Sequence, residues 1–377
     1  MGRKMKKLLE KIIYICNWQM NYSTWSKIAV CSVFIIIGGA ALVAFTVDPF
    51  YRYREPFFYD KVYYKIYATA PSLLRNEDYN TLMMGTSMTR NFFLEDIDGA
   101  FGGRSIKLAA AGGTTSDLKK FFDLAKAAKK DSLERVIFSL DIYPLNKTEP
   151  HYKEFDFMYE TGYSKEYRYL FSRQTFANIF YLWKRKLRPK RQRAHQTDRN
   201  RMFSSEYAGK KYGLEVVMYD ADHNQKIHHT QTPRNEKAYR QNLKNELLPM
   251  FDENPQIDFI VFLPPYHIYT YCQSEEFGEA DALIRQRSEV MLELLKRKNV
   301  KLFDFQADAS YVCDHELFSD VQHFGNIAAK RLLKDITSGR RELRTAEDVK
   351  HNEAALRKLI AENMPLYFRN LKKFRNR

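Results

Sequence analysis

Residues 79–89, YNTLMMGTSMT, are the part of this sequence that decides its fold. They consist of a short apolar run, Tyr79–Met84, followed by a turn that contains Gly85 and Ser87. A short apolar run that ends at turn residues is typical of a strand buried inside a sheet. The glycine two positions before Ser87 lets the backbone turn sharply and leaves the serine hydroxyl exposed. The stretch therefore predicts a first strand with an exposed serine at its C-terminal end.

Further apolar runs of similar length follow along the chain, at residues 105–108, 135–140, 258–263 and 300–303. Between them, residues 115–128 and 280–298 have apolar side chains at helical spacing. Strands that alternate with helices favour a parallel sheet covered by helices on both faces. The sequence therefore predicts an α/β protein, a three-layer α/β/α sandwich.

The alternation is interrupted between the third and fourth predicted strands. Residues 146–256 lie there, a segment too long for a bare loop. It contains the aromatic stretch YSKEYRYLFSRQTFANIFYLWKRK, then a basic run, then a second helical stretch at 235–250. We expect it to form an inserted helical cap over the sheet edge that carries the serine. The cap belongs to a domain at 48–338, and residues 339–377 are expected to form a basic helical tail.

An uncharged stretch from Ile28 to Val47 precedes this domain. At 1.5 Å per residue, a helix of that length matches a hydrocarbon core of about 30 Å. The alternatives are a buried core helix and the apolar part of a signal peptide. The stretch is long for a signal peptide, and the small-residue pair Ala40-Ala41 falls inside it. The sequence therefore predicts one transmembrane helix at 28–47.

Basic residues outnumber acidic ones in residues 1–27, where Glu10 is the single acid. This bias predicts a cytoplasmic N-terminus and a domain on the outer side of the cell membrane. Residues Leu8–Trp18 fit either an amphipathic helix at the membrane interface or a plain cytoplasmic anchor.

The formal net charge of +15 is unevenly distributed. Residues 184–211 carry eleven Lys and Arg against two acids, and residues 335–377 carry eleven against six. This pattern fits attraction to anionic lipid headgroups or to an acidic cell-wall polymer, and it equally fits a solvated loop. A nucleic-acid partner is disfavoured because the expected cell-surface location removes it and the chain has no recognised binding motif.

A second pattern, Asp320 and His323, precedes a predicted last helix at 326–335. A serine hydroxyl is a weak nucleophile at neutral pH. It needs an imidazole to take its proton and a carboxylate to orient the imidazole. A lone glycine-x-serine turn is common, but ligands of open α/β sheets bind at the carboxyl edge, where Ser87 and this pair would meet. The three residues therefore predict a Ser-His-Asp triad.

The two segments LMMGTSMTRNF (82–92) and SDVQHFGNIAAKRL (319–332) resemble the first and last motif blocks of the SGNH/GDSL hydrolase superfamily. The membrane segment followed by DPF at 48–50 is similar in layout to a cell-surface branch of that superfamily. This branch includes the D-alanyl transfer protein of teichoic acid modification and polysaccharide O-acetylation proteins of Gram-positive bacteria. The resemblance covers roughly residues 48–335 and implies a flavodoxin-like sandwich that needs no cofactor.

Carried over to this chain, the resemblance implies that Ser87 is the nucleophile, His323 the general base and Asp320 its orienting carboxylate. The glycine of the second block corresponds to Gly112 or Gly113. The backbone N–H of one of these is expected to complete an oxyanion hole with that of Ser87 or Met88.

The third block departs from the family pattern. An asparagine donor usually follows the third strand, but here Asp141 stands in SLDIY. An ionised aspartate accepts hydrogen bonds and would repel an oxyanion. Either Asp141 is protonated, or it positions another group, or Asn146 supplies the donor. His267 follows the fourth strand and is either a substrate contact or a surface-loop histidine.

No metal site is expected. The histidines of the insert lack Cys or Asp partners at ligand spacing and fit polar loop positions; these are His223, His228 and His229. Cys272 and Cys313 are expected on the outer side, either as a disulfide or as two free thiols.

These patterns predict a membrane-anchored serine esterase or O-acyltransferase that acts on an O-acyl group of a cell-envelope polysaccharide or teichoic-acid-like polymer. The resemblance also implies a membrane-bound O-acyltransferase as partner. A different class of function stays open, in which the chain keeps the fold and binds or assembles envelope polymer without catalysis.

Overall fold

The computed structural model describes residues 22–160, 162–187, 196–204, 209–223 and 235–376. Its centre is a mixed sheet in which five parallel strands are followed by one antiparallel edge strand. In spatial order these are β2 (Ser105–Ala109), β1 (Thr81–Gly85), β3 (Arg135–Ser139), β4 (Asp258–Leu263), β5 (Val300–Asp304) and β6 (Glu342–Leu343). The parallel α/β sheet predicted from the sequence is confirmed.

The strand order places a cleft at one edge of this sheet. The chain leaves β1 toward β2 on one side and later returns to β3 on the other side. Crossovers that leave in opposite directions separate at the carboxyl ends of β1 and β3, and open α/β sheets bind ligands at such a point. Every residue of β1 and β2 is buried, so both faces of the sheet are covered.

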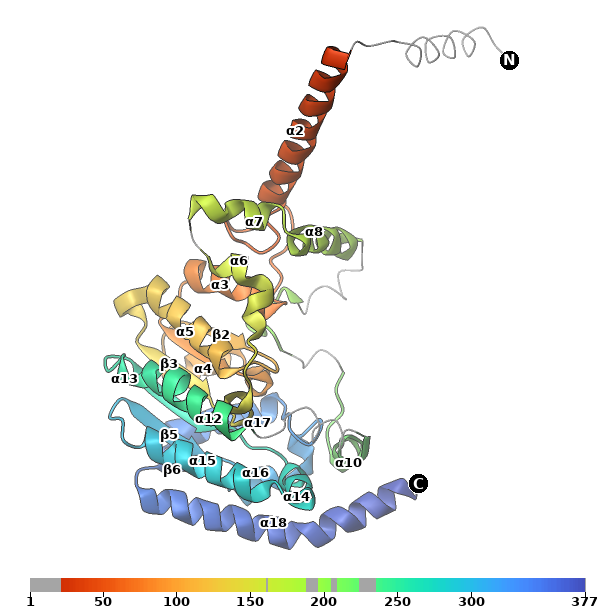
Figure 1. The fold of residues 1–377 in the computed structure, drawn as a ribbon. Helices are drawn as coiled ribbons and strands as arrows, with labels where there is room; N and C mark the ends of the chain where they lie inside the picture. The colour runs from red at the N-terminus through yellow and green to blue at the C-terminus, as the bar shows by residue number, and fades with distance from the viewer. Residues whose placement is uncertain (1–21, 161, 188–195, 205–208, 224–234, 377) are drawn as a thin grey trace. The chain divides into compact units, whose positions relative to one another are not determined.

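Helices form a layer on each face of the sheet (Figure 1). On one face, α4 (Leu94–Phe101) contacts α17 (Asn326–Thr337). On the other face, α5 (Thr115–Lys129) contacts α3 (Ile66–Asn76). Because parallel crossovers are right-handed, the connection from β1 to β2 and the one from β2 to β3 fall on opposite faces. The layers therefore make an α/β/α sandwich.

The inserted residues are divided between different parts of the molecule. The continuous helical stretch α12 (Glu236–Asn242), η8 (Leu243–Leu247) and α13 (Leu248–Asp252) leads into β4, and η8 contacts α5. This stretch is therefore the crossover helix of the sandwich. Helix α10 (Leu214–His223) contacts α18 (Ala346–Arg375). Residues 162–183 cluster instead with residues up to 49. The described residues of the insert are therefore divided between two units, and the cap over the active edge stays a prediction.

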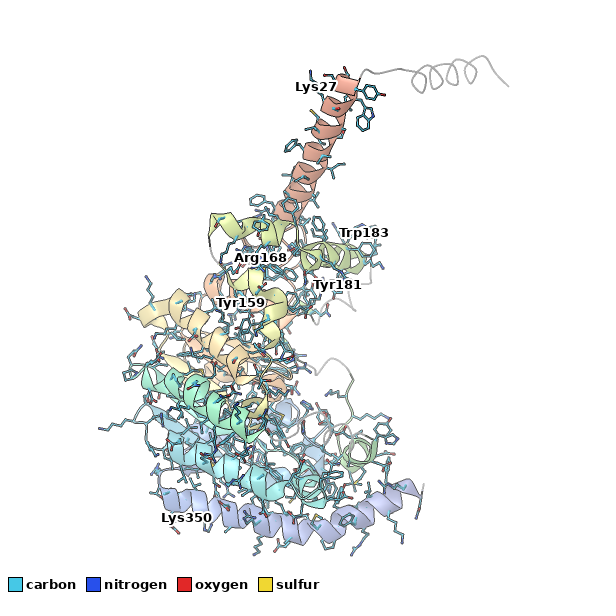
Figure 2. All side chains as sticks on the ribbon, viewed as in Figure 1. Lys27, Tyr159, Arg168, Tyr181, Trp183 and Lys350 are labelled. Carbon is cyan, nitrogen blue, oxygen red and sulfur yellow. The ribbon has the colours of Figure 1, made fainter. Side chains whose placement is uncertain are left out.

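The unit of residues up to 49 and 162–183 contains a long apolar helix, α2 (Tyr22–Val47). An 18-residue window of this helix has a mean hydropathy of 2.7, and the helix is long and apolar enough to cross a membrane. Two short helices, α7 (Glu166–Leu170) and α8 (Arg173–Lys186), complete the unit (Figure 2). Tyr169 Oη donates to Asp48 Oδ1 at 2.6 Å, and Asn178 Nδ2 donates to the Pro49 carbonyl at 3.1 Å. These bonds tie both helices to the end of α2. The Leu8–Trp18 prediction lies outside the described residues.

The basic tail is a single long helix, α18, which begins with a capping box at Thr345 and Asp348. It contacts α14 (Ile268–Glu276) and α15 (Ala280–Leu294) through a buried side. Asn352 Nδ2 on that side donates to Asp304 Oδ2 at 2.8 Å, and Asp304 also pairs with Arg287, which is fully buried. The C-terminal helix is therefore part of the packed domain.

Candidate active site

The nucleophile candidate lies where β1 ends. Ser87 opens a single 3-10 turn, Ser87–Thr89, two residues beyond the end of the strand. A side chain at Gly85 would place its Cβ 2.7 Å from the Ser139 carbonyl oxygen of β3 and closer still to Thr89 Oγ1. Only glycine lets the end of β1 approach β3 this closely. The same turn directs the Ser87 hydroxyl into the cleft.

The structure brings Ser87, His323 and Asp320 together in one chain of hydrogen bonds. Ser87 Oγ lies 2.7 Å from His323 Nε2, although 236 positions separate the two residues. His323 Nδ1 lies 2.9 Å from Asp320 Oδ2. Asp320 Oδ1 also accepts the backbone N–H groups of Gln322 at 2.8 Å and of His323 at 2.6 Å. One short loop thus holds both the imidazole and its carboxylate in place.

The charge of Asp320 fixes the tautomer of this chain. Burial alone would raise the pKa of Asp320, but the hydrogen bonds from His323 and Gln322 outweigh burial and lower the pKa to about 2. The carboxylate is therefore ionised at neutral pH and accepts a hydrogen bond from the N–H group at His323 Nδ1. The unprotonated Nε2 then faces the Ser87 hydroxyl, which is the arrangement that a general base requires.

Ser87 opens into a cavity of about 240 Å³. Its lining comes from the ends of β1, β2, β3 and β4 and from the His323 loop: Thr86, Ser87, Met88, Gly112, Gly113, Asp141, Tyr143, Pro144, Lys147, Tyr266 and Gln322. The residues after β3 and β4 in this set, apart from Asp141, were missed in the sequence analysis. The feature that could have identified them is their position directly after a strand, at the carboxyl edge of the sheet.

The four backbone N–H groups that we considered for an oxyanion hole differ in whether they already have an acceptor. The N–H of Gly113 donates to the Ala110 carbonyl at 2.8 Å and is therefore occupied. The N–H of Met88 is directed at Thr86 Oγ1 at 3.5 Å. The N–H groups of Ser87 and Gly112 have no acceptor within the part of the chain that the structure describes. These two line the cavity and are the best placed donors.

Asp141 is buried between two hydroxyl groups. Thr86 Oγ1 and Tyr266 Oη both donate to its carboxylate. Burial raises the pKa of Asp141 to about 6, against the opposing effect of these two hydrogen bonds. Asn146 is also buried, but its amide bonds Gln286 at 3.0 Å and it does not line the cavity. Of the alternatives, the geometry favours the one in which Asp141 positions other groups.

His267 is not brought to the site. Its ring is fully buried, so the expectation of a surface-loop histidine is wrong. His267 Nδ1 accepts the Tyr269 N–H at 3.1 Å at the start of α14, and Nε2 lies 2.7 Å from His315 Nδ1. Burial lowers the pKa of His267 well below its usual value. The residue is therefore a neutral core histidine that caps a helix.

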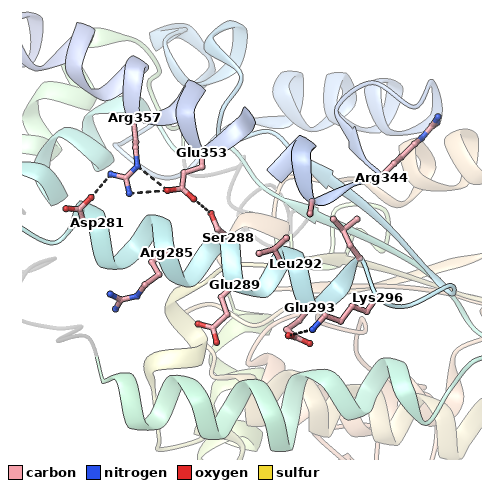
Figure 3. A pocket seen from close by; sticks show the side chains of 12 residues that line it. Asp281, Arg285, Ser288, Glu289, Leu292, Glu293, Lys296, Arg344, Glu353 and Arg357 are labelled. Carbon is pink, nitrogen blue, oxygen red and sulfur yellow. Dashed lines mark hydrogen bonds and ion pairs between the residues drawn. The ribbon is translucent and has the colours of Figure 1, made fainter. Parts of the chain in front are cut away.

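A larger cavity of about 1020 Å³ lies between α15 and the start of α18 (Figure 3). Its charged side chains neutralise one another, as in the bonds of Arg357 to Asp281 at 2.5 Å and to Glu353 at 3.2 Å. It contains none of the triad residues. The smaller cavity, which contains Ser87, is therefore the candidate active site.

Other reactive groups offer no competing site. The described residues contain no cluster of three or more His, Cys, Asp or Glu side chains placed to hold a metal ion. Cys272 and Cys313 are two free thiols, and burial raises the pKa of Cys272 to about 12. No protein-family model and no curated protein matches this chain. The assignment of the site therefore rests on the motifs and on the geometry described above.

Proposed function

We propose that this protein is a membrane-anchored serine esterase or O-acyltransferase of the SGNH type. Its substrate would be an O-acyl group on a cell-envelope polysaccharide or teichoic-acid-like polymer. The observation that supports this most is the hydrogen-bond chain Ser87–His323–Asp320 at the switch point of a parallel sheet. The alternative, a polymer-binding protein without catalysis, would leave that arrangement without a use.

In the proposed reaction, Ser87 Oγ attacks the carbonyl carbon of the acyl group while His323 Nε2 takes the hydroxyl proton. The N–H groups of Ser87 and Gly112 stabilise the oxyanion of the tetrahedral intermediate. His323 then returns the proton to the leaving alkoxide, and an acyl-Ser87 ester remains. Water attacks this ester in an esterase, and a sugar hydroxyl attacks it in a transferase; His323 removes the proton of either.

The membrane part of the proposal rests on α2 and on the charges that precede it. With α2 across the bilayer and the basic residues 1–27 in the cytoplasm, the active site lies outside the cell. An extracytoplasmic transferase needs an acyl donor that has crossed the membrane. A membrane-bound O-acyltransferase is the class of partner that would supply one.

Labelling by a fluorophosphonate probe tests the nucleophile. We expect the full chain in membranes to be labelled, the Ser87→Ala variant to be unlabelled, and both to show the same melting temperature. Ser132→Ala is the matched control because its exposed hydroxyl bonds only the Lys129 carbonyl, at 2.7 Å. If a folded wild-type chain is not labelled, or if Ser87→Ala is labelled as strongly, the enzyme proposal is wrong.

A further inference from the structure

A second cavity, of about 460 Å³, lies beside the one that contains Ser87. The two cavities are lined by adjacent residues of one turn, since Ala111 lines the second and Gly112 the first. Tyr67 Oη, on the wall of the second cavity, donates to the Ala111 carbonyl at 3.4 Å. A polymer segment bound in the second cavity would therefore lie next to the reactive serine.

The lining of this cavity is aromatic and cationic. It contains Tyr63, Tyr64, Lys65, Ile66, Tyr67, Arg90, Ala109, Ala111, Gln196, Arg201, Phe203 and Ser204, with no acidic side chain in the set. This distinguishes it from the cavity of Figure 3, where acids and bases alternate and pair. A wall with three cations and no acid is complementary to an anionic ligand.

Arg90 is the decisive residue of this wall. It is half-buried, three positions after Ser87, and no described carboxylate pairs with its guanidinium. Burial lowers the pKa of Arg90, as expected when a cation loses water without gaining a counter-ion. Because desolvating an unpaired charge is costly, such a residue is more readily explained by a ligand than by the stability of the fold.

The backbone around Arg90 is held firmly. Lys107, fully buried in β2, donates to the Arg90 carbonyl at 2.7 Å and to the Phe92 carbonyl at 2.5 Å. These two bonds fix the backbone from which the Arg90 side chain extends toward the cavity.

The other two cations differ from Arg90 in how far they are neutralised. Arg201 lies over the Phe93 ring at 5.0 Å and within 3.6 Å of Asp198, so its charge is shared. Lys65 is the N-cap residue of α3 and lies in the left-handed region, at φ 47°, which is costly for a residue other than glycine. Its ammonium lies 5.9 Å from the Tyr64 ring and forms no ion pair among the described residues. Lys65 and Arg90 therefore carry most of the free charge.

We propose that this second cavity binds a saccharide unit that carries an oxyanion, either a phosphate or a carboxylate. Arg90 and Lys65 bind the oxyanion, and the rings of Tyr63, Tyr64 and Tyr67 pack against the sugar. The assignment of this unit to the acylated polymer rests on the proposed function. The anion site itself stands on Arg90 and on the lining of the cavity.

Calorimetry on the full chain in phosphatidylcholine nanodiscs tests this site. Three hexameric probes are compared: oligogalacturonate for carboxylate, poly(glycerol phosphate) for phosphate, and neutral maltohexaose. We expect at least one anionic probe to bind 10-fold or more tightly than maltohexaose, since hydrogen bonds to charged groups commonly contribute a factor of about 10 to 100. Which anionic probe binds decides between carboxylate and phosphate.

The variants localise the binding. Arg90→Gln is expected to raise the dissociation constant of the anionic probe about 10-fold or more, and Lys65→Gln about 3-fold. The dissociation constant of maltohexaose should not change in either variant. Arg344→Gln removes one positive charge at an exposed position and is expected to have no effect. The proposal is overturned if neither anionic probe binds more tightly than maltohexaose, or if Arg90→Gln and Lys65→Gln both behave like Arg344→Gln.

The anion site and the acyl chemistry are tested separately. Ser87→Ala is expected to bind the anionic probe with unchanged affinity, because Ser87 does not line the second cavity. If the probe labels Ser87 but no anion binds, the proposed anion site is wrong and the proposed catalysis is unaffected. Anion binding by a chain that is never labelled supports the anion site and contradicts the proposed catalysis.

Discussion

At the scale of single residues, the site depends on the protonation states of two carboxyl groups, Asp320 and Asp141. Asp320 keeps its charge because ring and backbone N–H groups of its own loop surround it. Asp141 lines the same cavity as Ser87 but has a raised pKa, because burial outweighs the hydrogen bonds from its two neutral hydroxyl partners. The two carboxylates therefore differ in role through their surroundings.

The first prediction concerns the orienting carboxylate. An asparagine at position 320 offers an N–H group to His323 Nδ1, which favours the tautomer with a proton on Nε2 and removes the base. We expect Asp320→Asn to lower the rate constant of fluorophosphonate labelling by about 10³-fold or more. Asp314→Asn is the control because Asp314 only caps a short turn. A labelling rate within tenfold of the wild type would contradict the role of Asp320.

The second prediction concerns the pH dependence of stability. The pKa of Asp141 rises from an ordinary 3.8 to about 6 on folding, so the folded chain binds more protons than the unfolded chain between these values. The contribution of Asp141 to the free energy of unfolding therefore falls as pH rises from about 4 to 6. In Asp141→Asn this contribution is absent. The difference in melting temperature between wild type and variant should shift over that range, and a constant difference would contradict the buried ionisable carboxyl.

At the scale of elements, the turn after β1 is the most constrained part of the site. The strand must approach β3 so closely that no side chain fits at Gly85. The turn that follows places the Ser87 hydroxyl in one cavity and Arg90 in the next. A shift of this turn would therefore disturb both sites together.

The third prediction compares two glycines. Gly85→Ala would place a methyl group against the Ser139 carbonyl and Thr89 Oγ1, and we expect a loss of about 1–3 kcal/mol in the free energy of unfolding. Gly99→Ala in the exposed part of α4 meets no atom within 4 Å and should be neutral or stabilising by up to about 1 kcal/mol. Denaturant unfolding measures both. Equal effects would contradict the close approach of β1 and β3.

The sequence predicted the elements better than it predicted their surroundings. The five parallel strands are visible as apolar runs because most of their residues are buried. Two-residue β6 has no such pattern. The two hydroxyls that bond Asp141 come from Thr86 and Tyr266, which lie far from it in the sequence, so no local spacing reveals them. The second cavity is likewise assembled from segments near residues 65, 90, 110 and 200. Such long-range contacts become apparent only in the folded chain.

At the scale of the whole molecule, a buried ionic contact connects the C-terminal helix to the sheet. Arg287 of α15 pairs with Asp304 of β5, and Asn352 of α18 donates to the same carboxylate. Two nitrogens of the buried guanidinium, Nε and Nη1, have no hydrogen-bond partner among the described residues. The contact is therefore sensitive to the loss of its single negative charge.

The fourth prediction follows from that imbalance. Asp304→Asn leaves Arg287 buried without a counter-ion, and we expect a loss of about 3–5 kcal/mol in the free energy of unfolding. Glu342→Gln is the control because it breaks the solvent-accessible pair with Arg344, whose loss should change the free energy of unfolding far less. Denaturant unfolding compares the two variants. Similar losses in both variants would show that the buried pair contributes no more to the free energy of unfolding than the surface pair.

The hydrogen bonds from Tyr169 to Asp48 and from Asn178 to Pro49 have a practical consequence for purification. A shortened chain that starts at Phe50 to avoid the apolar helix would still carry α7 and α8, yet it would lack both acceptors. The side chains of Tyr167, Phe171, Phe180 and Trp183 are already exposed in this unit. Such a chain would expose these aromatic helices without the two hydrogen bonds that tie them to the end of α2. Extraction of the intact chain in detergent avoids this source of aggregation.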